Sequence, residues 1–274
     1  MSSTTTIVLR TLKQRPTGNQ GRRIALRVAV VIAALLVWHL FSLTALGRSG
    51  DVPSPIVAFE RLFELWGTAV YWNAVATTMT SWGLGLLVSV IVGVPLGLII
   101  GSNAKIEVSV RLIVDFLRTI PSIAFLPLAL LMFGVDLRTP VILIFLAAVW
   151  PLLIQSTYAA SQIDPVLKQV RRSFHLSWWQ YIRFQFAPSA LPFITTGLRI
   201  AATICLLTAI AVELLSGAPG VGSQLQGALI VSQSATLYAY VLTAGVLGIL
   251  INVLLVWLQR VLIWWHPSVR GDAR

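Results

Sequence analysis

Long apolar runs constrain this chain more than any other feature of its sequence. A helix needs about 20 predominantly apolar residues to cross a bilayer. Hydrophobic residues make up 57% of the 274 residues and the mean hydropathy is +0.86, which is more apolar surface than a soluble core of this size buries. We therefore predict an all-α, polytopic membrane protein with six transmembrane helices, at about residues 24–46, 73–101, 112–134, 140–157, 193–215 and 236–264.

The basic residues predict how these helices are oriented, because loops rich in Lys and Arg stay in the cytoplasm. Such residues collect in the polar tail 1–23, around residue 105, before the fifth run and near the C-terminal tail 266–274. The intervening loops hold only Arg48, Arg61 and Arg138. We expect both termini in the cytoplasm and a transmembrane domain at 24–265. The net charge of +11 then reflects membrane topology and does not indicate nucleic-acid binding.

One long polar interval, residues 164–192, separates two apolar runs in the second half of the chain. It opens with an Asp-Pro pair, which is typical of a helix start, and its last proline, Pro192, is expected to break the structure that follows. Leu167, Val170 and Phe174 recur at helical spacing, with basic residues on the other faces. The pattern predicts a short amphipathic helix that serves as a cytoplasmic docking surface. The alternative is an interfacial helix that lies on anionic lipid.

The interval resembles the cytoplasmic loop of binding-protein-dependent ABC importer permeases, in the group that handles nitrate, sulfonates and taurine. Further similarities to that group extend over roughly residues 50 to 268. They include Pro53-Ser54-Pro55, residues 117–121, 126–128 and 133–136, Glu213, residues 220–222 and residues 265–267. Within the loop and the run after it, the matching residues are Asp164, Leu167, Arg172, Trp179, Pro188, Ala190, Leu191, Pro192, Ile194, Gly197, Leu198 and Arg199.

This resemblance implies a type I ABC importer permease with a cytoplasmic coupling helix, in a loop at about 158–192, and a location in the bacterial plasma (inner) membrane. The chain would be the channel-forming subunit of an ATP-driven importer, with no catalytic residue and no cofactor of its own. The implied partners are a second permease copy, two ATP-binding subunits and an extracytoplasmic solute-binding protein, within membrane lipid. The resemblance points to a small organic anion such as a sulfonate, taurine or nitrate, but the same group handles other solutes as well.

The residues that dock the ATPase are expected in the coupling loop, where apolar anchors would fill a groove as an amphipathic helix does. Several positions differ from the family pattern: Gln169 replaces glutamate, Arg171 replaces alanine, His175 replaces glycine and Ala187 replaces leucine. The family glycine permits a tight turn, which histidine adopts at a backbone cost unless φ stays negative. The candidate docking residues are Leu167, Gln169, Val170, Arg171, Arg172, Phe174, His175, Leu176 and Trp179.

Prolines and charges within the spans are candidates for gating or structural roles. Proline frees backbone groups, which is tolerated where helices line a water-filled cavity. Ionisable residues inside a membrane are functional suspects, although residues near helix ends reach the interface at low cost. The candidates are Pro121, Pro127, Arg199 and Glu213.

Two spacings predict simpler packing. Gly93, Gly97 and Gly101 fall on one face of the second span and predict close helix contact there. Asp115 and Arg118, three residues apart, are expected to pair on one helix face.

Several other activities lack support in the sequence. It contains no phosphate-binding GxxxxGK[ST] loop, so ATP would be hydrolysed by a partner. Three scattered histidines and a single cysteine do not predict a metal site. A secondary carrier that works without an ATPase is the main alternative, although no internal repeat supports it. A channel or membrane enzyme is a further alternative, but it would not explain the amphipathic loop.

Overall fold

The computed structural model describes residues 20–44, 51–162, 166, 169 and 173–265. Every regular element among those residues is helical, in agreement with the all-α prediction. The chain divides into two compact units, residues 1–56 and 57–274, each described here by itself. The helices are α1 (Gln20–Ser42), α3 (Pro55–Trp66), α4 (Ala69–Gly101), α5 (Ala104–Leu117), η1 (Ser122–Phe125), α6 (Leu126–Phe133), α7 (Arg138–Ser161), α9 (Trp178–Tyr181), η2 (Ile182–Phe186), α10 (Ala187–Ser216), α11 (Val221–Ile230) and α12 (Ser234–Leu262).

In the first unit, α1 is a single apolar helix of 23 residues. Its window Ala25–Ser42 is long and apolar enough to cross a membrane. The side chains of this window are almost all exposed within the chain, as expected of a helix that faces lipid. Near its end, the indole Nε1 of Trp38 donates a hydrogen bond to the carbonyl oxygen of Pro53 at 3.1 Å.

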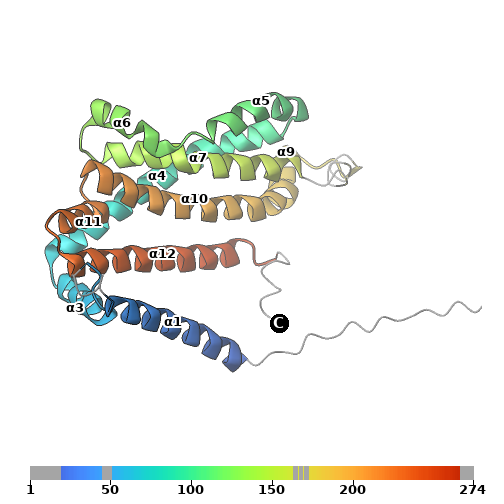
Figure 1. Cartoon of the computed structure of the whole chain (residues 1–274). Coiled ribbons are helices and arrows are strands. Elements are labelled where there is room, and N and C mark those ends of the chain that lie inside the picture. The colour runs from blue at the N-terminus through green and yellow to red at the C-terminus, as the bar shows by residue number, and fades with distance from the viewer. Residues whose placement is uncertain (1–19, 45–50, 163–165, 167–168, 170–172, 266–274) are drawn as a thin grey trace, which may run out of the picture. The chain divides into compact units, whose positions relative to one another are not determined.

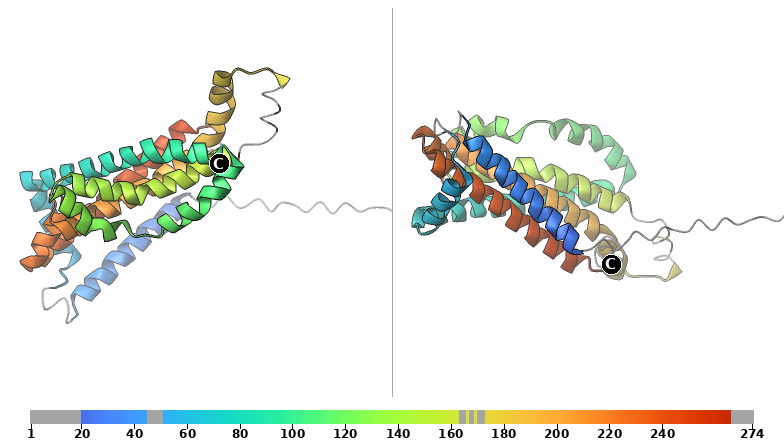
Figure 2. Two further views of the ribbon diagram at one scale, coloured as in Figure 1. Left: turned by 90° about the horizontal axis from the view of Figure 1, so that it is seen from above. Right: turned by 60° about the horizontal axis from the view of Figure 1, so that its bottom comes forward.

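The second unit is built around α7, which packs against α4 on one side and α10 on another, while α12 packs against α10 (Figure 1). The views in Figure 2 show the same long helices side by side. The residues at the centre of these contacts are small, among them Ala148, Ala201 and Cys205, all 0% exposed. Because lipid provides no hydrophobic drive between helices, such small residues let the helices gain dispersion energy by close approach.

Glycines on α4 determine how closely it meets α7. A Cβ on Gly97 would collide with the carbonyl oxygen of Leu153, and one on Gly101 with that of Thr157. A Cβ on Gly93 would lie 3.0 Å from the carbonyl oxygen of Val149. The close contact predicted from the glycine spacing is therefore confirmed.

The same register shows that α4 and α7 run parallel, because successive glycines of α4 meet successively later turns of α7. The chain between two parallel helices must return along their length. It does so through α5, η1 and α6, a pair of helical segments bent by 70°. The described residues thus contain five helices able to cross a membrane, or six when the bent pair counts as one span.

This third span was expected to break at Pro121 and Pro127; it breaks at Pro121 but not at Pro127, and it starts earlier than the predicted residue 112. The helix begins at Ala104, where the side chain of Asn103 accepts a hydrogen bond from the backbone N–H of Lys105. Pro121 lies in the break between the two segments. Pro127 lies in the first turn of α6, where its missing N–H costs no helical hydrogen bond.

Two other expectations were wrong. The Gly- and Ser-rich stretch from Ser216 to Ala235 was expected to be a loop but contains α11, whose apolar face at Val221, Leu225 and Ala228 is buried. Pro192 was expected to break the chain but lies inside the continuous helix α10. Neighbouring helices compensate for a missing backbone hydrogen bond in a membrane protein.

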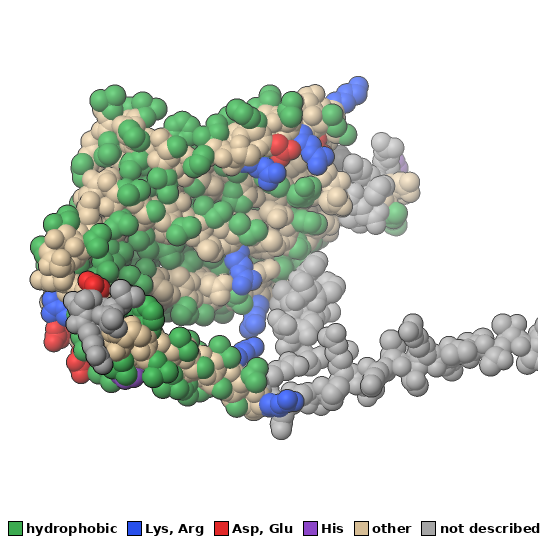
Figure 3. Space-filling model, in the orientation of Figure 1, with side chains coloured by type: hydrophobic (Ala, Val, Ile, Leu, Met, Phe, Trp, Pro, Cys, Tyr) green, Lys and Arg blue, Asp and Glu red, His purple; other side chains and the backbone are tan. Residues whose placement is uncertain are grey.

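Apolar side chains cover most of the face shown in Figure 3, with few charged groups between them. On α4, Leu87 and Ile91 are 54% and 61% exposed, whereas the opposite, glycine-rich face is buried. This distribution fits a helix with one face toward lipid and one toward its neighbours.

Replacing Gly97 by alanine is expected to lower the free energy of unfolding by about 1–3 kcal/mol, because the added Cβ meets backbone of α7 that cannot move aside. Thermal unfolding in detergent measures the loss. Gly83→Ala on the same helix is the matched control, since a Cβ there meets nothing within 4 Å. Equal melting temperatures for the two variants would contradict the close contact between α4 and α7.

Candidate functional site

The predicted coupling loop joins the end of α7 at Ser161 to the start of α10 at Ala187. Four of the nine candidate docking residues, Leu167, Val170, Arg171 and Arg172, lie outside the described residues. The other candidates are Gln169, which is helical and exposed, and Phe174, His175, Leu176 and Trp179. These last four are close in sequence: three lie just before α9, and Trp179 lies within it.

This stretch exposes large apolar side chains. Phe174 is 73% exposed and Trp179 is 68% exposed, while Leu176 is half-buried. Two residues that the sequence analysis did not select, Trp178 and Phe184, are 63% and 68% exposed. Both are aromatic residues within the polar interval 164–192, and this was the signal in the sequence that could have identified them. We name this set, Phe174, Leu176, Trp178, Trp179 and Phe184, the coupling surface.

Local hydrogen bonds fix the backbone under the coupling surface. The Ser177 hydroxyl accepts a hydrogen bond from the backbone N–H of Gln180 at 3.3 Å, and the Gln180 side chain accepts one from the backbone N–H of Ser177 at 2.9 Å. This capping box starts α9. The following turn, η2, is a π-helix that continues directly into α10. Tyr181, the buried last residue of α9, contacts Trp178 and Phe186 through its ring.

His175 adopts a left-handed conformation, with φ at 49°. This is the position where the family pattern has glycine, the residue that enters this region without steric cost. A non-glycine residue there costs about 1–2 kcal/mol, although histidine is among the residues found in this region more often. The tight turn implied by the family pattern is therefore present, and histidine occupies it with backbone strain.

At the opposite end of α10, Glu213 is fully buried and holds three helices together. Its carboxylate accepts hydrogen bonds from the hydroxyls of Thr78 at 2.8 Å and Ser81 at 3.4 Å, both on α4. It also accepts one from the backbone N–H of Gly222 at 3.0 Å. Thr78 in turn accepts a hydrogen bond from the backbone N–H of Val221 at 2.9 Å. These bonds satisfy two buried backbone N–H groups at the start of α11 that have no partner within the helix.

Glycines make room for this carboxylate. A Cβ on Gly220 would overlap the carboxyl group of Glu213, and a Cβ on Gly222 would overlap the backbone of α10 at Ile210. Glu213 and the Gly-Val-Gly triplet at 220–222 are separate features in the sequence, with no pattern that links them. The structure brings them together, and the N-terminus of α11 also favours the negative charge.

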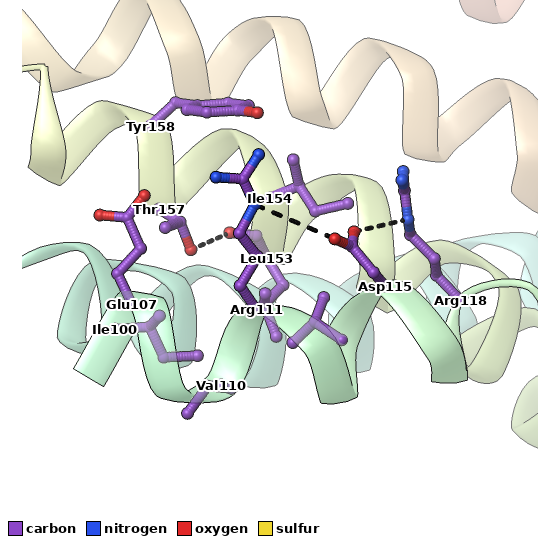
Figure 4. Close-up of a pocket in the computed structure, with 11 residues that line it drawn as sticks. Ile100, Glu107, Val110, Arg111, Asp115, Arg118, Leu153, Ile154, Thr157 and Tyr158 are labelled. Atoms are coloured by element: carbon purple, nitrogen blue, oxygen red, sulfur yellow. Dashed lines mark hydrogen bonds and ion pairs between the residues drawn. The ribbon is translucent and has the colours of Figure 1, made fainter. Parts of the chain in front are cut away.

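A pocket of about 150 Å³ lies between α5 and the last turns of α7, beside the exit into the coupling loop (Figure 4). The Nε of Arg118 lies 3.1 Å from one carboxylate oxygen of Asp115, and the Nε of Arg111 lies 4.0 Å from the other. The predicted pair of Asp115 and Arg118 is thereby confirmed. All three side chains are substantially exposed, so the pairs add little stability.

Arg199 lies on α10 and faces α12. Its Nε and Nη2 both donate hydrogen bonds to the Oδ1 of Asn252, at 3.2 Å and 3.0 Å. Thr196, Ile200, Thr203 and Gln259 complete the lining of a hollow of about 370 Å³. Among the residues that the structure describes, no group of three His, Cys, Asp or Glu side chains is placed to hold a metal ion.

Replacing Gly222 by alanine is expected to lower the free energy of unfolding by about 1–3 kcal/mol, because its Cβ would force α11 away from the Glu213 carboxylate. Thermal unfolding of the full chain in detergent checks this. Gly227→Ala, on the same helix with nothing within 4 Å of its Cβ, provides the control. An unchanged melting temperature for Gly222→Ala would show that α11 is not held in this way.

Comparison with known proteins agrees with this geometry. The chain is 30% identical to the bicarbonate transport system permease protein of Synechococcus elongatus, over 90% of this chain and 94% of that protein. It is 29% identical to a nitrate import permease of Synechocystis, covering 87% and 89% of the two chains. Against the taurine transport system permease of Escherichia coli the identity is 27%, covering 91% and 93%.

The fold also matches a solved structure. An inward-facing structure of the methionine ABC transporter MetNI superposes with a TM-score of 0.62 at 19% identity, covering 70% of this chain and 96% of that one. The family model described as "Binding-protein-dependent transport system inner membrane component" matches residues 93–263, which include the bent span, the coupling loop, Glu213 and α11. The chain therefore belongs to the family of binding-protein-dependent transport system inner membrane components, the ABC importer permeases.

Proposed function

We propose that this chain is the channel-forming subunit of an ATP-driven importer for a small anion. Two copies would pair in the bacterial inner membrane, with two ATPase subunits on the cytoplasmic side and a solute-binding protein on the other. The coupling surface carries this proposal, because it concentrates exposed aromatic side chains on a capped, continuous segment. The basic loops support cytoplasmic termini.

The solute class follows from the relatives that the chain resembles. Their names specify bicarbonate, nitrate and taurine, and a further relative, from Bacillus subtilis, is a putative aliphatic sulfonate permease. All four solutes carry an oxyanion group, although their sizes and overall charges differ. We infer a small solute with such a group for this chain.

The connection of the coupling surface to the helices suggests how ATP hydrolysis would act. The surface is covalently continuous with α7 at one end and with α10 at the other. A force on it therefore moves two central helices of the second unit, and α10 carries Glu213, which is bonded to α4 and α11. An ATPase that pushed the two coupling surfaces of a dimer together would thus move the whole second unit of each copy.

Changing both Phe174 and Leu176 to aspartate is expected to lower recovery of a co-expressed ATPase at least tenfold in a pull-down from detergent. Apolar anchors buried in a groove each contribute about 2 kcal/mol or more at an interface, and buried carboxylates would be unpaired there. Phe63→Asp on α3 is the control, because Phe63 is 60% exposed but lies outside the coupling surface.

Stoichiometric recovery of the ATPase with both variants would contradict docking through the coupling surface. If the intact, folded chain recovers no ATPase yet takes up solute in vesicles, it functions as the secondary carrier considered above.

His175→Gly is expected to preserve ATPase recovery and to raise thermal stability slightly, because glycine relieves the left-handed strain at φ 49° while its greater freedom in the unfolded chain offsets part of the gain. His175→Val should instead reduce recovery severalfold, since a β-branched residue is a severe outlier there. The same pull-down measures both variants. A loss of recovery with glycine alone would indicate that the imidazole itself contacts the ATPase.

A further inference from the structure

A polar stripe crosses the middle of α10. Thr196, Arg199 and Thr203 recur at helical spacing on an exposed face of a helix that is otherwise largely apolar. At helical rise, Arg199 lies about 18 Å from the start of α10 at Ala187, within the predicted fifth span 193–215. Asn252 and Gln259 of α12 line the same hollow of about 370 Å³.

The charge of Arg199 is not balanced within the second unit's long helices. Its two hydrogen bonds go to one neutral amide oxygen of Asn252. The sequences of α4, α7, α10 and α12 contain a single acidic residue, Glu213. Glu213 lies about 21 Å further along α10 and is enclosed by its own partners on α4 and α11. The acidic residues of α5, Glu107 and Asp115, line the separate pocket between α5 and α7, where Asp115 pairs with Arg118.

An exposed arginine within a span does not face lipid without a substantial cost, which is greatest at the centre of the bilayer. Charged residues inside membrane proteins face the bundle interior or a water-filled cavity. The hydroxyls of Thr196 and Thr203 beside Arg199 also fit a wet surface. A water-filled space along this face of α10 and α12 would remove that cost.

We propose that Arg199, with Asn252, Gln259, Thr196 and Thr203, forms an oxyanion-binding site along the solute pathway; this inference rests on the proposed function. The guanidinium has five N–H donors, and the bonds to Asn252 use two of them. The remaining donors match two oxygens of a planar or tetrahedral oxyanion. Asn252 holds the guanidinium in position, and the side-chain amides of Asn252 and Gln259 add neutral N–H donors. The hydroxyls of Thr196 and Thr203 line the hollow and donate to the backbone carbonyl oxygens of Pro192 and Arg199.

The residues of this site suit an anion that passes through better than one that stays bound. Each copy contributes one positive charge, which attracts an anion and repels cations, and the other side chains that line its hollow are uncharged. So few charges keep the site weak enough to release its ligand. The hollow of about 370 Å³ has room for a small oxyanion together with several waters. Selection among anions would then belong to the solute-binding protein, and this site would select by charge.

The transport test uses the complete importer, with its ATPase and solute-binding protein, reconstituted in proteoliposomes. Uptake of nitrate, bicarbonate, taurine and an alkanesulfonate is measured for the wild type, Arg199→Gln and Arg199→Lys. We expect Arg199→Gln to lower uptake at least tenfold, while ATP hydrolysis stimulated by the loaded binding protein stays within twofold of the wild type. Uptake by Arg199→Lys should be intermediate, because lysine keeps the positive charge but lacks the paired N–H donors of the guanidinium.

Arg138→Gln is the matched control, because it removes the same charge from an exposed position at the start of α7, beside Asp136. Uptake by Arg199→Gln equal to that of Arg138→Gln would overturn the site and leave the proposed function intact. Parallel loss of uptake and ATP hydrolysis in Arg199→Gln would also overturn it, since the residue would then be needed for structure. No uptake of any of the four anions by the wild type would instead overturn the proposed solute class.

A chemical test does not depend on transport. The single native cysteine, Cys205, is buried, so Thr203→Cys adds one accessible thiol to the hollow. We compare the rates at which this thiol reacts with anionic and with cationic methanethiosulfonates. Adding Arg199→Gln should lower the anionic-to-cationic rate ratio at least fivefold, whereas adding Arg138→Gln should leave the ratio unchanged. Millimolar nitrate should slow the anionic reagent. A thiol that does not react, or a ratio independent of Arg199, would overturn the site.

Discussion

Close approach of helix backbones is the constraint on which the second unit depends. In lipid, helices gain little from burying apolar surface against one another, so their association relies on dispersion between closely packed backbones. The glycines of α4 permit that approach to α7, and Gly197 of α10 approaches the Gln155 side chain of α7 in the same way. The three helices therefore form one packed group, to which the coupling loop and the Glu213 network are attached.

The features that the sequence predicted are those with a local signal. Apolar length located the spans, and the four-residue glycine spacing identified the packed face of α4. The start of α11 was missed because glycines at 220 and 222 are typical of a loop when considered alone. They are required by a carboxylate on another helix, and hydrogen bonds between residues 78 and 213 leave no periodic pattern that a sequence shows.

The same distinction applies to the candidate site residues. Aromatic residues in a polar interval indicated the coupling surface, although Trp178 and Phe184 joined it only when the fold was known. Arg199 was recognised as a charge within a span, but its surroundings depend on α12, more than fifty residues away in sequence, which contributes Asn252 and Gln259. The two ends of α10 thus act differently. The N-terminal end follows the coupling surface, which meets the ATPase in the proposed importer, and the C-terminal end fixes α10 to its neighbours through Glu213.

The π-helical turn at Ile182–Phe186 has a further consequence, since it joins α9 to α10 without a break. A π-turn closes its hydrogen bonds over one more residue than an α-turn. Each residue of an α-helix advances the direction of its side chains by about 100°. The extra residue therefore sets the angular phase between the aromatic side chains of α9 and the polar stripe of α10. Because α10 is held by α4, α7 and α11, loss of one residue here would turn the aromatic side chains of α9 relative to the polar stripe while every helix stayed intact.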